Sequence, residues 1–222
     1  LNPPAPRSRI LHRERVENEL REIINYLLTI IQAGTGFGKS TSIISFLQKI
    51  TTPIYWYTIS GTDRDPKLFL AKLFTAFNQN GISIGNEALR ILDMPDATHQ
   101  EALIALLNGI TKNINQDTLL ILDDFHRVSD VSEIIYFIDW MVNRLPPKLH
   151  LVVITRHHPD FPSMNKWIVK SNVIEIDKHT LSFTPDEIKQ LFEESYGIPL
   201  SNKTVTLLLG KTEGWAIGLQ MV

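Results

Sequence analysis

Hydrophobic residues gather in five short runs along the chain, at residues 27–31, 53–60, 118–122, 149–155 and 172–177. The runs are rich in β-branched and aromatic residues, which is typical of β-strands. The first, third and fourth runs are apolar almost throughout, as expected for strands that are covered on both faces. Between the runs, apolar residues recur at the 3.6-residue spacing of helices.

Strands and helices alternate up to residue 177, and only helical patterns follow. This order predicts an α/β fold: a mainly parallel five-stranded sheet flanked by helices, followed by a small helical unit. Residues typical of helix N-termini mark where several of the predicted helices begin. They are the caps Asp65 and residues 129–132, and the capping boxes that begin at Thr98 and Thr184. Residues 80–81, Gly197 and Gly210 are expected to end helices.

The composition mainly excludes certain kinds of site and partner. With 222 residues, of which 43% are hydrophobic, the chain can bury a sizeable core. A net charge of −2 gives no global case for nucleic-acid binding. The chain has no cysteine, which rules out disulfides and thiolate metal sites and suits a cytoplasmic protein. No apolar run reaches membrane-spanning length, so no membrane partner is expected. Separately, we interpret the chain as a piece excised from a longer protein.

A glycine-rich loop at residues 33–41, Ala-Gly-Thr-Gly-Phe-Gly-Lys-Ser-Thr, follows the first strand and opens a helix. Glycines let the backbone approach a phosphate closely, and successive N–H groups together with a helix N-terminus attract an anion. Lys39 is placed to reach the β- and γ-phosphates, and the Ser40 hydroxyl to hold Mg²⁺. The pattern therefore predicts a phosphate-binding loop, although Ala33 stands where glycine is usual. The alternative is a glycine-rich turn before a core helix.

Two carboxylates, Asp123 and Asp124, stand at the end of the third strand. Ligands of open α/β sheets bind at the carboxyl ends of strands. We expect Asp123 to hold Mg²⁺ and Asp124 to orient or deprotonate the attacking water. By itself an Asp-Asp pair is more often a loop start or a helix cap, but the glycine loop earlier in the chain favours a nucleotide site.

Arg156, at the end of the fourth strand, is a candidate sensor of the γ-phosphate; otherwise it is a surface arginine at a strand end. His126 either supports the site or is an ordinary loop histidine. Residues 157–160, which include two histidines and an aspartate, could suggest a metal site, but adjacent side chains rarely converge on one ion. At the N-terminus, a basic segment that contains Arg13 is either the solvated, charged start of a helix or an arm that lies beside the adenine of the nucleotide.

These motifs resemble one family, the signal transduction ATPases with numerous domains, and within it the N-terminal ATPase of MalT-like, large LuxR-type transcriptional regulators. The resemblance covers nearly the whole chain. Its strings lie at residues 9–15, 33–41, 120–126, 145–150, 154–156 and 212–220. Ala33 is also usual in that family. Related ATPases place a Gly-x-Pro motif against adenine, and residues 214–216, Gly-Trp-Ala, occupy its place here without the proline.

The resemblance implies a P-loop NTPase core of the ASCE type, with Asp124, Lys39 and Arg156 as catalytic residues and Ser40 and Asp123 as Mg²⁺ ligands. It implies nucleotide contacts from these residues: Ala33, Gly34, Thr35, Gly36, Phe37, Gly38, Lys39, Ser40, Thr41 and Arg13. We divide the chain into an N-terminal arm and helix (1–28), the ATPase core (29–178) and the start of a helical subdomain (179–222).

The function implied by the resemblance is a slow, Mg²⁺-dependent ATPase that acts as a switch. ADP marks a monomeric resting state, and ATP favours self-association. DNA would be contacted only through other domains, which are absent from this chain. Two other functions are weaker. An AAA-like motor or loader would need steady turnover and an arginine finger acting on a neighbouring subunit. A small-molecule phosphotransferase would need an acceptor pocket and an arginine-rich lid, which the chain does not show.

Overall fold

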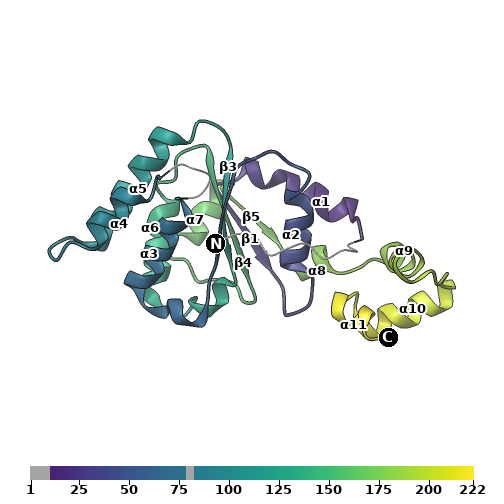
Figure 1. Cartoon of the computed structure of the whole chain (residues 1–222). Coiled ribbons are helices and arrows are strands. Elements are labelled where there is room, and N and C mark those ends of the chain that lie inside the picture. Colours follow the sequence, from purple (N-terminus) through teal and green to yellow (C-terminus); the bar gives the residue numbers. More distant parts are fainter. Residues whose placement is uncertain (1–10, 79–82) are drawn as a thin grey trace.

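The computed structural model describes residues 11–78 and 83–222. Most of the expected N-terminal arm and the expected helix stop at 80–81 lie outside these ranges. The structure is a sheet between two layers of helices, with a further helical unit beyond one end (Figure 1). The strands are β1 (Leu28–Gln32), β2 (Ile54–Thr58), β3 (Thr118–Asp123), β4 (Leu149–Thr155) and β5 (Val173–Ile176).

The α-helices are α1 (Glu14–Arg21), α2 (Lys39–Leu47), α3 (Pro66–Ala76), α4 (Asn86–Leu92), α5 (His99–Asn113), α6 (Ser132–Val142), α7 (Met164–Val169), α8 (Lys178–Leu181), α9 (Pro185–Tyr196), α10 (Asn202–Thr212) and α11 (Ala216–Gln220). Three short 3₁₀ turns, η1 (Glu22–Asn25), η2 (Gly61–Arg64) and η3 (Phe125–Arg127), complete the assignment.

The five strands are all parallel and lie in the order β2-β3-β4-β1-β5. This confirms the predicted fold class. The strand before the glycine loop and the strand before the acidic pair are therefore not neighbours, because β4 lies between them. Parallel strands end at one edge of the sheet, so this order brings the glycine loop, Arg156 and the acidic pair to the same edge.

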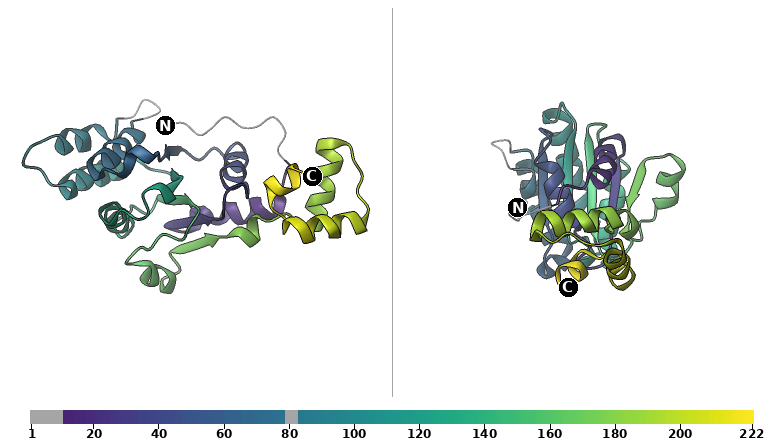
Figure 2. Two further views of the ribbon diagram at one scale, coloured as in Figure 1. Left: turned by 90° about the horizontal axis from the view of Figure 1, so that it is seen from below. Right: turned by 90° about the vertical axis from the view of Figure 1, so that its right-hand side faces the viewer.

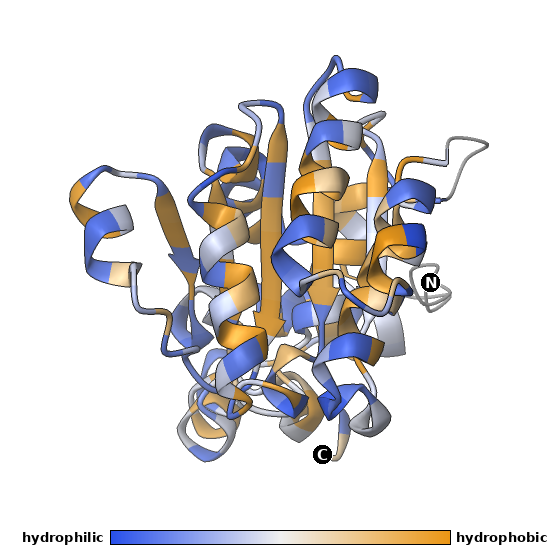
Figure 3. Cartoon of the chain, turned by 90° about the vertical axis from the view of Figure 1, so that its left-hand side faces the viewer, coloured by the Kyte–Doolittle hydropathy of each residue, from blue (hydrophilic) through white to orange (hydrophobic). Residues whose placement is uncertain are grey.

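Both faces of the sheet are covered, which explains the nearly continuous apolar runs. Helices α3 to α7 pack on one face of the sheet, and α1, α2 and α8 pack on the other. Each face has its own hydrophobic cluster. Hydropathy colouring shows apolar strands between helices that are apolar toward the sheet and polar outside (Figure 3). Trp56 and Tyr57, expected in the core, are completely buried on opposite faces of β2.

Helices α9, α10 and α11 lie together beyond one end of the sheet (Figure 2). A third, separate hydrophobic cluster joins them. Leu11, from the N-terminal segment, packs into this cluster. Leu181 of α8, by contrast, packs into the cluster on the sheet. The segment from residue 177 to 184 is therefore the connection between the sheet and the terminal helices.

Several predicted helix boundaries are confirmed: the Asp65 cap, both capping boxes, and the left-handed stop at Gly197. Two are wrong. Residues 129–132 do not cap α6 through a side chain, because Val131 is its N-cap and the Ser129 hydroxyl donates to the His126 carbonyl instead. Helix α10 also continues through Gly210, since one helical glycine costs only about 1 kcal/mol.

The predicted N-terminal helix is shorter than expected. Its α-helical part ends at Arg21, and a 3₁₀ turn leads into β1. Helix α7 was not predicted, because its six residues are too few to establish a period. Within the described ranges, no helix combines the length and the hydropathy needed to cross a membrane.

Candidate functional site

The glycine loop lies between the end of β1 and the first turn of α2. Gly36 and Gly38 have φ values of 82° and 81°, in the left-handed region that glycine tolerates. Gly38 is the N-cap of α2, and because it has no side chain it makes no capping hydrogen bond to the first turn of that helix. Those N–H groups, with the positive end of the helix dipole, suit an anion such as a phosphate.

Lys39 is folded over this loop. Its ammonium group donates to the carbonyl oxygens of Ala33 at 2.7 Å and Gly34 at 2.9 Å. Burial, and then the nearby charge of Arg156, lower the pKa of Lys39. The ammonium group is thus held at the mouth of the loop, where an incoming anion would relieve the electrostatic cost of its position.

Ser40 and Asp123 come together from two different elements. The Ser40 hydroxyl donates to the Asp123 carboxylate at 3.2 Å and 3.4 Å. Burial, and then the charge of Asp124, raise the pKa of Asp123. A buried carboxylate beside a hydroxyl is a set of oxygen donors that fits Mg²⁺, which usually takes one or two protein ligands and completes its shell with water and phosphate oxygens.

The described residues do not form a metal site from protein side chains alone. In the described ranges, no group of three or more His, Asp or Glu side chains could hold an ion. At residues 157–160, where the sequence could suggest a metal, His158 pairs with Glu175 at 3.1 Å. The oxygen pair of Ser40 and Asp123 is therefore the arrangement that we consider for Mg²⁺.

Asp124 has a strained backbone. Its φ of 58° is left-handed although it is not glycine, a conformation that costs of order 1 kcal/mol and is frequent at functional sites. Its N–H donates to Asp123 Oδ1 at 2.9 Å. Its own carboxylate faces Arg127 Nε at 3.4 Å and His126 Nδ1 at 3.8 Å. Arg127, whose effect the sequence does not reveal, is thus a partner of Asp124.

His126 lies in this cluster and is largely buried. Its Nδ1 has no hydrogen-bond partner among the residues that the structure describes. Burial, and then the charge of Arg156, lower the pKa of His126. The ring is therefore neutral near pH 7 and close to Asp124, which agrees better with a supporting position than with an ordinary loop histidine.

Arg156 directly follows β4. Its side chain is exposed and borders the same cavity as Lys39 and Asp124. This position is compatible with both candidate roles of Arg156, a phosphate sensor and a surface arginine. The two roles differ only in whether a phosphate contacts the guanidinium group. Its charge is near enough to lower the pKa values of Lys39 and His126.

A cavity of about 330 Å³ runs from these residues to the terminal helices. One wall is the glycine loop and α2; the other walls come from α1 and from the helical unit. The lining residues that the sequence analysis did not single out share no motif. They are Leu11, Val16, Glu17, Ser42, Ser45, Phe183, Leu191, Ile217 and Gln220. Leu11, Ile217 and Gln220 fall within the strings at residues 9–15 and 212–220, so the family resemblance points to their segments. The others come from distant segments with ordinary core or surface patterns, and no sequence signal could have identified them.

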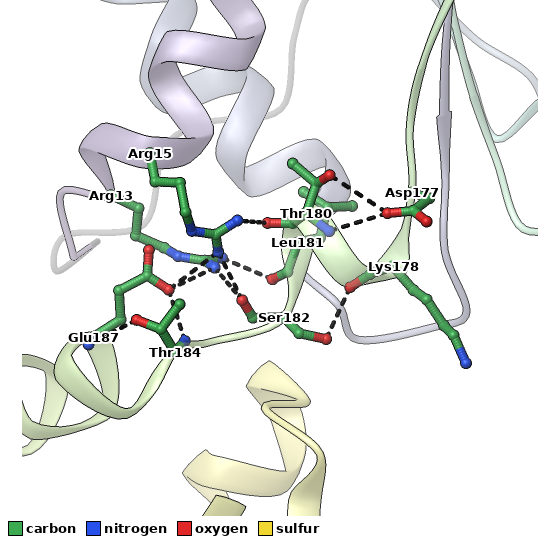
Figure 4. Close-up of polar contacts among 9 residues, drawn as sticks. All are labelled: Arg13, Arg15, Asp177, Lys178, Thr180, Leu181, Ser182, Thr184 and Glu187. Carbon is green, nitrogen blue, oxygen red and sulfur yellow. Dashed lines mark hydrogen bonds and ion pairs between the residues drawn. The ribbon is translucent and has the colours of Figure 1, made fainter.

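Arg13, a candidate nucleotide contact, borders the cavity but uses its guanidinium elsewhere (Figure 4). It donates to the carbonyls of Leu181 and Ser182, both at 2.8 Å, and to Glu187 at 2.9 Å. It also lies over the Phe183 ring, 4.1 Å from the centroid. Arg13 therefore joins the N-terminal segment to the helical unit, and direct contact with a nucleotide remains a prediction.

Arg15 extends this link. It donates to the Thr180 carbonyl at 2.7 Å and to the Ser182 carbonyl at 2.9 Å, as Figure 4 shows. Glu187 also accepts from the Thr184 N–H, so one carboxylate closes the capping box of α9 and pairs with Arg13. The start of α1 and the start of α9 are thus held together along one side of the cavity.

The other side of the helical unit lies directly on the glycine loop. The Trp215 indole donates to the Thr35 carbonyl at 2.8 Å, and the Ile217 N–H donates to the Gly36 carbonyl at 3.1 Å. A Cβ on Gly36 would lie 2.6 Å from Ile217 Cδ1, closer than such contacts occur. The second glycine of the motif, Gly36, therefore makes room for the helical unit as well as for a ligand.

Comparison with known proteins places these features in context. No protein-family model matches the chain. MalT, an HTH-type transcriptional regulator from Serratia proteamaculans, is 26% identical over 230 residues, matching 100% of this chain and 24% of its own length. The serine/threonine-protein kinase PknK of Mycobacterium tuberculosis is 26% identical, matching 99% of this chain and 20% of its own length. The chain spans about a quarter or less of these curated relatives.

Solved structures share the fold. A signal transduction ATPase with numerous domains (STAND) from Pyrococcus horikoshii, which carries a tetratricopeptide repeat sensor, has a TM-score of 0.67 at 20% identity, covering 98% of this chain and 30% of that one. The Orc1 protein of Aeropyrum pernix, solved in complex with DNA, has a TM-score of 0.56 at 14% identity, covering 96% of this chain and 58% of that one.

Proposed function

Because this chain belongs with the STAND-type P-loop ATPases, as a relative of MalT and PknK, we propose that it is the nucleotide switch of a signal-dependent transcriptional regulator. In this proposal the chain binds ATP, hydrolyses it slowly, and rests with ADP bound as a monomer. The ATP-bound form self-associates. DNA contact belongs to other parts of such a regulator.

One observation carries the proposal: Lys39, Asp124 and Arg156, which follow three different strands, border a single cavity. Lys39 would bind the β- and γ-phosphates, with the free N–H groups of the loop and of α2 around them. Arg156 would contact the outermost phosphate and lose that contact when the phosphate leaves, which makes it the residue that distinguishes ATP from ADP.

Hydrolysis would use the acidic pair. A water held by Asp124 attacks the γ-phosphorus, the bond to the bridging β-γ oxygen breaks, and the carboxylate accepts the proton that the water loses. Arg127 would hold the carboxylate of Asp124 in place through its hydrogen bond, and the neutral ring of His126 lies 3.8 Å from that carboxylate. Ser40 and Asp123 would hold Mg²⁺, which neutralises phosphate charge when bound.

A second function, a loader or motor of the AAA-like type, is favoured by one finding, the similarity to Orc1. The two functions differ in turnover. A switch retains its nucleotide and turns over far below the typical enzyme rate of about 10 s⁻¹, whereas a motor turns over steadily. A single-turnover measurement with bound ATP separates them.

The decisive experiment is the substitution Lys39→Ala. We expect ATP and ADP affinity to fall by at least about 100-fold, because a buried charged contact worth about 3 kcal/mol is lost. The measurement is calorimetric titration with each nucleotide in the presence of Mg²⁺. Lys170→Ala, which removes an exposed lysine at the end of α7, is the matched control and should leave affinity unchanged. Equal affinity in Lys39→Ala and the parent chain would refute the site.

A further inference from the structure

One buried carboxylate borders the cavity and has no part in phosphate chemistry. Glu17 of α1 is only 4% exposed, and it lines the cavity beside Val16 and Ser45. Helix α2 rises about 1.5 Å per residue, so Ser45 lies about 9 Å beyond Lys39 along the helix. Glu17 pairs with Lys49, which follows the last turn of α2, so it lies away from the glycine loop, on the side of the cavity toward which the ribose and base of a nucleotide would extend.

The two oxygens of Glu17 are used unequally. Oε1 accepts from Lys49 Nζ at 2.5 Å and pairs with His12 Nδ1 at 2.7 Å. From the residues that the structure describes, Oε2 receives no hydrogen bond. Burial raises the pKa of Glu17, but the bonds from Lys49 and His12 outweigh burial, so the pKa lies below its ordinary value. The group is ionised at neutral pH and has one acceptor oxygen to offer.

The surroundings suit the flat faces of a nucleobase. Leu11, Val16, Phe183 and Leu191 are apolar side chains along the cavity, and they come from the N-terminal segment, α1 and the helical unit. Such a lining with a few fixed polar groups is typical of small-molecule sites, in which the polar groups set specificity. Glu17 is a buried group of this kind that can only accept.

We propose that Glu17 reads the base of the nucleotide, with Oε2 accepting a hydrogen bond from the exocyclic amino group at position 6 of adenine. This inference rests on the proposed function. Guanine and hypoxanthine carry a carbonyl oxygen at position 6, which would face the carboxylate without a shared proton. Guanine could offer its N1–H and N2 amino group instead, but that pairing uses two acceptor oxygens, and Oε1 is already occupied. Hypoxanthine has only its N1–H to offer, and a bond from it would bring the carbonyl oxygen at position 6 close to the same ionised carboxylate.

The test compares ATP with inosine triphosphate, whose base carries a carbonyl at position 6 and a proton on N1 in place of the adenine amino group. The parent chain should prefer ATP by about 10- to 100-fold, because a buried hydrogen bond to a charged group is replaced by repulsion. In Glu17→Gln the preference should fall to within about threefold, since an amide can both donate and accept. Dissociation constants are measured for both nucleotides on the 222-residue chain.

A structural role for Glu17 predicts something else. Lys49→Met breaks the same ion pair but leaves the carboxylate, so it should lower stability and keep the preference for ATP. If both variants keep that preference, Glu17 only links α1 to α2 and the inference is wrong. A ratio near one in the parent chain overturns it without any variant. If neither nucleotide binds in a Lys39-dependent manner, the proposed function itself fails.

Discussion

Two buried carboxylates lie beyond the ends of neighbouring strands and differ in almost every other respect. Asp63 follows β2 and is completely buried, and Asp123 ends β3 with 4% exposure. Both are therefore at the edge of the sheet where ligands bind. Position and burial alone cannot tell which of them is available for a ligand.

Their hydrogen bonds separate them. Asp63 accepts from the Tyr57 hydroxyl, from both the N–H and the hydroxyl of Ser60, from Thr62 and from Lys72. Burial raises the pKa of Asp63, but these bonds outweigh it and lower the pKa to about 2. Within residues 11–78 and 83–222, Asp123 accepts hydrogen bonds only from the Ser40 hydroxyl and the Asp124 N–H, and burial and the charge of Asp124 raise its pKa.

The comparison shows what separates a structural carboxylate from one that is available to bind. The charge of Asp63 is stabilised by the folded chain itself, so the residue stabilises the β2–α3 connection. The charge of Asp123 is stabilised incompletely, so a cation would be bound there with a gain in free energy. Three substitutions test this distinction, beginning with the residue that we place in the chemistry next to Asp123.

The largest effect is expected from Asp124→Asn. An amide cannot accept the proton of the attacking water, so single-turnover hydrolysis should slow by about 10²- to 10⁴-fold while ATP binding is retained. Asp130→Asn is the control, because Asp130 is exposed and pairs with Arg64 away from the cavity lining. Unchanged turnover in Asp124→Asn would remove this residue from the catalytic role.

Asp63→Asn should reduce the free energy of unfolding by about 2–4 kcal/mol, because it disrupts a buried network around a charge and leaves Lys72 without its partner. Urea unfolding at pH 7 measures the loss. Nucleotide affinity, extrapolated to the folded fraction, should be unchanged. A loss below about 0.5 kcal/mol would show that the network is not what stabilises this connection.

Asp63 should also make the free energy of unfolding depend on pH in the acid range. A carboxyl with a pKa of about 3.9 when unfolded and about 2 when folded contributes about 2–3 kcal/mol of stability above pH 4. Because the folded pKa is the lower one, this stability is lost as pH falls from about 4 to 2, with about 1 kcal/mol gone at pH 3. Unfolding curves at pH 5 and pH 3 should therefore differ less in Asp63→Asn than in the parent chain.

The smallest effect on stability is expected from Asp123→Asn, within about 1 kcal/mol and in either direction, since it removes a buried charge that the fold stabilises incompletely. Its signature is functional. The gain in ATP affinity that Mg²⁺ produces in the parent chain should disappear, as measured by titration with Mg²⁺ and with a chelator. A stability loss as large as that of Asp63→Asn would remove the distinction between the two carboxylates.

Several parts of the candidate site could be predicted from the sequence because they are local. Residues 33–41 supply adjacent backbone N–H groups and one lysine, and neighbours in the chain are neighbours in the loop. Asp123, Asp124 and Arg156 follow apolar runs, and parallel strands end at one edge whatever their order. The alternation of strands and helices was enough to predict the fold class, which the structure confirms.

Contacts between distant segments could not be predicted in this way. Nothing in the pattern around Arg13 shows that its guanidinium pairs with Glu187, and nothing around Trp215 shows that its indole reaches Thr35. The sequence likewise does not reveal that Glu17 lies on the cavity, because its pattern is that of an ordinary charged helix. These contacts depend on how α1 and the helical unit pack against the core.

The sequence by itself therefore determined the fold class and the half of the candidate site that we propose for phosphate, because both follow from residues that are close together in the chain. The tertiary structure alone decided the other half. It placed β4 between β1 and β3, laid Ile217 on Gly36, and put Glu17 in the lining of the cavity. Long-range packing sets those contacts, and local propensity carries no information about it.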